Sequence, residues 1–95
     1  MDEFEWDEAK AAKCFSERKI SFQDAAASLL GVTVTNASHR EGEARFASIC
    51  DCNGLIVVVV WTLRGSARRI VTARRARIDE RERYREAIGR AAQAR

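Results

Sequence analysis

The chain has no proline, one histidine and three cysteines among its 95 residues. Cys14, Cys50 and Cys52 are an odd number with no histidine pattern beside them, which argues against a disulfide framework and a zinc site. We expect small buried or half-buried thiols. The apolar run at 55–61 is far shorter than the ~18 residues that cross a bilayer, so we expect no membrane segment. A carboxylate cluster, a glycine-rich phosphate loop and a nucleophile elbow are also missing.

Positive charge is concentrated in the last third of the chain. Residues 1–31 hold 4 Lys/Arg against 7 Asp/Glu, residues 32–63 hold 2 against 3, and residues 64–95 hold 11 against 4. A basic surface beside an acidic one is typical of a protein that binds a polyanion, most commonly nucleic acid. Composition alone leaves RNA, DNA and an acidic protein open as partners.

The length leaves room for one domain, which we place at 1–95. The start, MDEFEWDEAK, is acidic where a secretory signal would be basic and then apolar. We therefore expect a cytoplasmic protein.

The first part of the chain predicts a short strand and two helices. Residues 4–6 alternate as in a strand, and Asp7 is a good N-cap for a helix that ends near Ser16. Ser21, with an aspartate three residues later, resembles a weak capping box for a second helix that ends at Gly31.

The remainder predicts four antiparallel strands and a helix. The strands are expected at 32–35, 45–52, 55–61 and 68–73, with a polar loop at 36–42, an Asn-Gly hairpin turn at 53–54 and a turn at 64–66. Asp79 and Glu82 resemble a capping box for the last helix. The expected fold is α+β, with helices packed against an antiparallel sheet of four to five strands.

Candidate catalytic residues follow from what RNA cleavage without a metal requires. The phosphorane needs charge stabilisation, and arginine supplies it because its planar fork pairs with two phosphate oxygens. Arg64, Arg69 and Arg74 lie on or beside the strand after the turn at 64–66. His39, which we place in the polar loop, can exchange a proton near neutral pH. The alternative for each is an ordinary solvated side chain.

Six segments, in order and without large gaps, closely resemble the BrnT family of ribonuclease toxins. They are FEWDEAK at 4–10, SFQDA at 21–25, HREGEARF at 39–46, LIVVVVWT at 55–62, RRIVTAR at 68–74 and ERERYREA at 80–87. The family pattern is kept at Trp6, Lys10, Phe22, His39, Glu43, Arg45, Arg64, Arg69, Thr72, Arg74, Glu82 and Tyr84.

The resemblance implies a RelE-like compact fold and cleavage of RNA, without metal or cofactor, that arrests translation. It also implies a BrnA-like antitoxin with a ribbon-helix-helix domain, through which the complex binds operator DNA and represses its own operon. Further candidate RNA-binding residues are Lys10, Arg45, Arg68, Arg75 and Arg77.

One departure from the family pattern lies between the first two helices. The family reads Asn and then Lys-His-Gly, where this chain has Cys14 and then Glu17, Arg18 and Lys19. Arg18, the fifth candidate catalytic residue, thus replaces a histidine. Two hypotheses follow: a ribonuclease toxin, or a module of weak or lost activity whose basic face binds an antitoxin and assists DNA binding.

Overall fold

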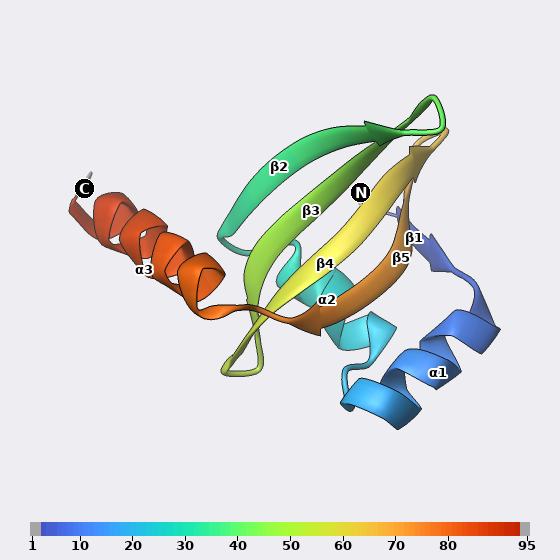
Figure 1. Ribbon diagram of the computed structural model, residues 1–95, viewed down its shortest axis with the longest axis horizontal. Helices are drawn as coiled ribbons and strands as arrows, with labels where there is room; N and C mark the ends of the chain where they lie inside the picture. Colours follow the sequence, from blue (N-terminus) through green and yellow to red (C-terminus); the bar gives the residue numbers. More distant parts are fainter. Residues whose placement is uncertain (1–2, 94–95) are drawn as a thin grey trace.

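The fold is built on a five-stranded sheet with the strand order β1-β5-β4-β3-β2 (Figure 1). The computed structural model describes residues 3–93. Over that range the elements are β1 (Glu3–Trp6), α1 (Glu8–Arg18), α2 (Phe22–Ser28), β2 (Thr33–Arg40), β3 (Glu43–Cys52), β4 (Leu55–Arg64), β5 (Ala67–Arg75) and α3 (Ile78–Gln93). The expected α+β class and the four-stranded antiparallel run are confirmed. None of the helices in this range is long and apolar enough to cross a bilayer.

The sheet is mixed, which corrects the expectation of an antiparallel sheet. β1 pairs with β5 in parallel, and Glu3–Trp6 lie opposite Ala67–Ile70. Between β1 and β5 the chain forms α1, α2 and the strands β2, β3 and β4, so no local turn signal could reveal this pairing. β1 leaves the rest of β5 unpaired on that side.

β2 is longer than predicted, and the expected loop at 36–42 is wrong. The strand runs to Arg40, and Glu41 and Gly42 form the hairpin turn with φ values of 54° and 78°. His39 therefore lies in a strand opposite Ala44, not in a loop. β2 is an edge strand, and pairing with β3 holds its polar residues in extended conformation although their sequence lacks apolar alternation.

Helices cover the two faces of the sheet unequally (Figure 1). α1 and α2 pack on one face, which we call the covered face, over the larger buried cluster that includes Phe22, Val57, Val59 and Ile70. α3 packs on the opposite face, the open face, over a small cluster of Ile49, Val58, Ala76 and Tyr84. The Tyr84 hydroxyl donates to the carbonyl of Val32 at 3.1 Å. Most of the open face beyond this cluster carries no helix.

Two helix caps decide where α1 and α3 begin. Asp7 Oδ1 accepts the N–H groups of Ala9 and Lys10 at 2.8 and 3.1 Å, as predicted, and these bonds, that of Lys10 foremost, lower the pKa of Asp7. The predicted Asp79–Glu82 box is wrong, because α3 already begins at Ile78. Glu80 instead accepts the N–H of Arg77 at 2.8 Å.

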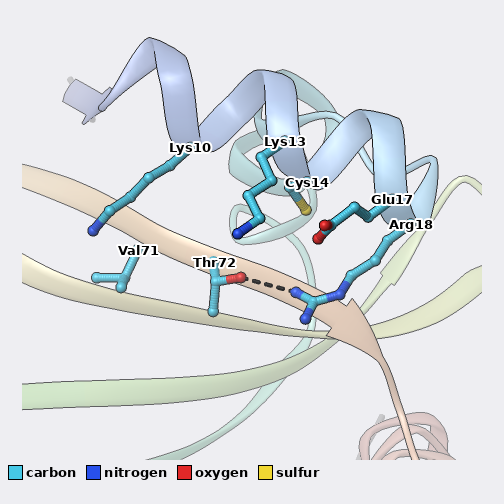
Figure 2. Close-up of a pocket in the computed structure, with 7 residues that line it drawn as sticks. All are labelled: Lys10, Lys13, Cys14, Glu17, Arg18, Val71 and Thr72. Atoms are coloured by element: carbon cyan, nitrogen blue, oxygen red, sulfur yellow. Dashed lines mark hydrogen bonds between the residues drawn. The ribbon is translucent and has the colours of Figure 1, made fainter.

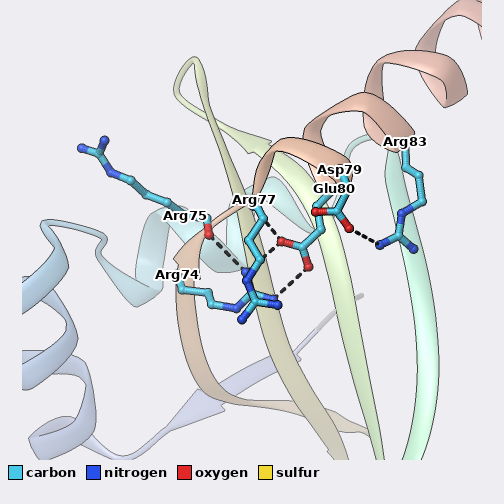
Figure 3. A network of polar contacts seen from close by, with 6 residues as sticks. All are labelled: Arg74, Arg75, Arg77, Asp79, Glu80 and Arg83. Carbon is cyan, nitrogen blue, oxygen red and sulfur yellow. Dashed lines mark hydrogen bonds and ion pairs between the residues drawn. The ribbon is translucent and has the colours of Figure 1, made fainter.

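Glu80 also binds the guanidinium of Arg74 with both carboxylate oxygens, at 2.8 and 2.9 Å (Figure 3). This bond is the main cause that lowers the pKa of Glu80 from 4.5 to about 2, and it raises the pKa of Arg74. The pair ties the end of β5 to the first turn of α3.

We expect Glu80→Gln to lower the free energy of unfolding by roughly 2–3 kcal/mol at pH 7, since each pKa unit is worth about 1.4 kcal/mol and the Arg74 side chain is partly solvated. A carboxyl group whose pKa is lowered on folding stabilises the folded state at pH values above its unfolded pKa, near 4.5. This stabilisation is lost as the pH falls towards 2. The free energies of unfolding of the wild type and the variant, measured with urea, should therefore converge as the pH is lowered over this range. Asp79→Asn, which removes the other first-turn carboxylate of α3 and its exposed 3.7 Å pair with Arg83, is the control and should lower the free energy of unfolding much less.

Candidate active site

Two rows of side chains cross the open face of the sheet beyond α3. Residues directly opposite in paired strands point to the same face. The first row is Ser38, Arg45, Thr62, Arg69 and Glu5, and the second row is Asn36, Ala47, Val60 and Thr72. The face therefore presents two arginines beside a strip of small residues.

The first row is held by polar contacts at three of its five positions. Arg69 Nη1 donates to Glu5 at 2.9 Å, and the buried Thr62 hydroxyl lies 3.1 Å from a Glu43 carboxylate oxygen and 2.8 Å from the Ala44 carbonyl oxygen. Arg45 differs, because its Nε is buried without a hydrogen-bond partner among the described residues. A buried donor left unpaired costs about 1–3 kcal/mol, so a movement of this side chain that brings Nε to an acceptor would be stabilising.

α1 lies along the part of β5 that β1 leaves unpaired, and it turns several polar side chains towards it (Figure 2). This side of the helix carries Lys10 and the residues that follow it by three, seven and eight positions, which are Lys13, Glu17 and Arg18. Arg18 Nη1 donates to Thr72 Oγ1 and to the Ala73 carbonyl, both at 3.0 Å. The guanidinium is thereby fixed at the sheet edge.

A bulge joins this edge to the open face. Val60 pairs with Thr72 and Trp61 with Ile70, so Val71 is an extra residue in β5. A bulge bends the strand and redirects side chains near it. Val71 and Thr72 line two hollows: one of about 270 Å³ with the α1 side chains, and one of about 290 Å³ with Ser38, Arg45, Phe46, Ala47 and Val60. We call these the edge hollow and the sheet hollow.

The structure gathers four of the predicted site residues around these hollows and disperses the others. Lys10 and Arg18 line the edge hollow, Arg45 lines the sheet hollow, and Arg69 lies in the row of Arg45. Arg64 is on the same face but at the exposed end of β4, paired with Ala67.

The remaining candidates lie elsewhere. Strand alternation places His39, Arg68 and Arg75 on the covered face, where the Arg68 guanidinium lies 5.1 Å from the ring of Trp61. Figure 3 shows Arg75 pointing away from the Arg74–Glu80 pair, and Arg77 stands in the link before α3. Trp61 stacks on Phe46 at 4.4 Å, as a half-buried packing aromatic.

Sequence reasoning missed Lys13, Glu17, Ser38 and the small residues of the second row. The helical spacing of Lys10, Lys13, Glu17 and Arg18 is a signal that could have grouped the α1 side chains. No sequence signal marked the bulge at Val71, on which the junction of the two hollows depends. All three predicted buried thiols are confirmed: Cys14, Cys50 and Cys52 are free and buried. Burial raises the pKa of Cys50 and Cys52.

The sequence model of a family described as "Ribonuclease toxin, BrnT, of type II toxin-antitoxin system" matches residues 6–80. The chain belongs to the BrnT family. This match confirms the resemblance seen in the motifs, and it spans all the residues that line the two hollows. As a BrnT family member of a type II system, the chain has an antitoxin partner.

A solved BrnT structure is similar in fold. The crystal structure of the Brucella abortus ribonuclease toxin, BrnT, has 22% sequence identity and a TM-score of 0.63, covering 81% of this chain and 99% of that chain. At this identity the likeness shows the shared fold. No curated protein matches the chain.

Proposed function

We propose that this BrnT protein is a metal-independent endoribonuclease that inhibits translation by cutting RNA in the edge hollow. The observation that carries the proposal is Arg18, which Thr72 Oγ1 and the Ala73 carbonyl hold at 3.0 Å beside Lys10 and Lys13. A cation fixed in advance stabilises charge that develops on a phosphoryl group without reorganising during the reaction.

The residues of the hollow match the steps of the reaction. The ribose 2′-OH attacks its own phosphate, and Glu17, the one carboxylate among the residues lining this hollow, accepts the proton. Arg18 and Lys10 stabilise the phosphorane, and the Lys13 ammonium protonates the leaving 5′ oxygen. The products are a 2′,3′-cyclic phosphate and a 5′ hydroxyl, and proton exchange with solvent then returns Glu17 and Lys13 to their starting charge states.

The antitoxin in this proposal is BrnA-like, with a ribbon-helix-helix domain that carries the complex to operator DNA. An acidic segment laid over Lys10, Lys13, Arg18 and Arg45 would relieve their mutual repulsion and exclude RNA. One surface would then serve both substrate and antitoxin.

A second candidate function is supported by the side chains of the site. Arg18 stands where the family has histidine, and no histidine is among the residues that line the two hollows. A chain without an efficient proton carrier would keep the basic surface only to bind its antitoxin.

Cleavage of a single-stranded RNA by the purified protein in excess EDTA tests the proposal. We expect cuts with 2′,3′-cyclic phosphate ends, and a rate about 100-fold lower for Glu17→Gln, the usual scale for loss of a general base. Arg85→Ala, an exposed change on α3, is the control and should leave the rate unchanged. Absence of cleavage, together with normal growth when the chain is expressed without its antitoxin, would favour the inactive module.

A further inference from the structure

The sheet hollow has a composition that differs from that of the edge hollow. Ala47, Val60 and Val71 form an apolar floor, and all three are half-buried. Ser38 and Thr72 supply hydroxyls at the rim, and Arg45 supplies the one charged side chain among the lining residues. Ala47 is the smallest side chain of its row, which accounts for the depression between Asn36 and Val60.

Arg45 brings a second observation, independent of the shape. Its Nε is buried and has no hydrogen-bond partner among residues 3–93, although the side chain reaches the hollow. A ligand that brings an acceptor for the Arg45 guanidinium and an apolar surface for the floor would therefore match the residues that line this hollow. A phosphate has acceptors but no apolar surface, and an aliphatic side chain has the reverse.

We propose that the sheet hollow is a subsite for one unpaired nucleobase of the RNA, beside the phosphate that is cut. A base has an apolar face that packs on Ala47, Val60 and Val71, and its edge carries carbonyl or ring-nitrogen acceptors for Arg45. Proteins that read single-stranded RNA use these two contacts, a packed base face and a hydrogen-bonded base edge.

The position of the hollow agrees with this assignment. Val71 and Thr72 line it and the edge hollow alike, and Thr72 Oγ1 accepts from Arg18. A nucleotide whose phosphate meets Arg18 would thus have a neighbouring base over the sheet. Guanine suits Arg45 better than adenine does, because O6 and N7 of guanine accept side by side, whereas adenine places a donor next to N7.

This subsite rests on the proposed function, because it would hold one base of the RNA that the protein cuts. The first test scans a short RNA with a single abasic residue at each position around the mapped cut. We expect kcat/KM to fall at least 10-fold at one position next to the cut and to change little elsewhere. Guanine at that position should be cut faster than adenine. A flat abasic profile would overturn the subsite.

Protein variants test the same point from the other side. Ala47→Leu fills the floor, and Ser38→Leu, on an exposed strand residue, obstructs the rim without a change in the core. Both should lose the guanine preference and raise KM, while cutting of an RNA that is abasic at the sensitive position should stay as in wild type. Ser66→Leu, the same substitution at an exposed turn residue outside both hollows, is the matched control and should keep the preference.

A binding measurement separates this inference from the proposed ribonuclease activity. A 2′-O-methyl RNA cannot be cut, so the difference in affinity between its intact and abasic versions, measured by fluorescence anisotropy, reports the subsite without a contribution from cleavage. Weaker binding of the abasic version with no cleavage of ordinary RNA would keep the subsite and remove the activity. Cleavage with equal binding of both versions, and with Ser38→Leu as selective as wild type, would remove the subsite and keep the activity.

Discussion

Replacing Arg18 with alanine is expected to lower the rate constant for RNA cleavage about 100-fold, the scale on which removal of one preorganised charge-stabilising donor acts. The guanidinium is held by Thr72 Oγ1 and the Ala73 carbonyl, so its position does not depend on the substrate. Single-turnover cleavage at saturating protein measures this rate without a contribution from binding.

Thr72→Val separates the position of Arg18 from its charge. The variant removes the hydroxyl acceptor but keeps the Ala73 carbonyl and the cation, so its rate should fall less than that of Arg18→Ala. In the double variant the loss should equal that of Arg18→Ala alone, because Thr72 acts through Arg18. Losses that multiply would show that Thr72 acts on the substrate independently.

The sequence predicted the elements whose signals are local. Asp7 is an acceptor placed before a helical pattern, and Asn53 and Gly54 both have the positive φ values, 55° and 89°, that this turn favours. The length of β2 could not be predicted, since its residues 36–40 become a strand only by pairing with β3. The strand β1 was predicted from its alternation, but its parallel pairing with β5 could not be, because the paired residues lie more than 60 positions later in the chain.

The arrangement of the arginines was the least predictable part of the site. Alternation sends Arg68 to the covered face and Arg69 to the open face, and the extra residue Val71 reverses the alternation between Arg69 and Thr72. A bulge has no marker in this sequence, so the composition of the basic segment could not tell which of its cations converge. Glu80, which engages Arg74, was hidden by the more regular spacing of Asp79 and Glu82.

The double variant Lys10→Ala/Lys13→Ala is expected to weaken binding of a 2′-O-methyl RNA roughly 10–100-fold at low salt, because each lysine that contacts a phosphate releases counterions. The slope of log affinity against log salt should fall by about 1.4, at roughly 0.7 per contact for a single strand. Both lysines are exposed on α1, and alanine favours a helix, so the fold should be retained.

Arg75→Ala/Arg85→Ala removes the same charge from exposed residues outside the two hollows and is the matched control. If overall charge governs binding, the two double variants will weaken it equally, and the edge hollow has no special part in holding RNA. If the lysines contact phosphates there, only Lys10→Ala/Lys13→Ala will lower the salt slope, because long-range attraction to a net charge is lost in both variants while counterion release at defined contacts is lost in one.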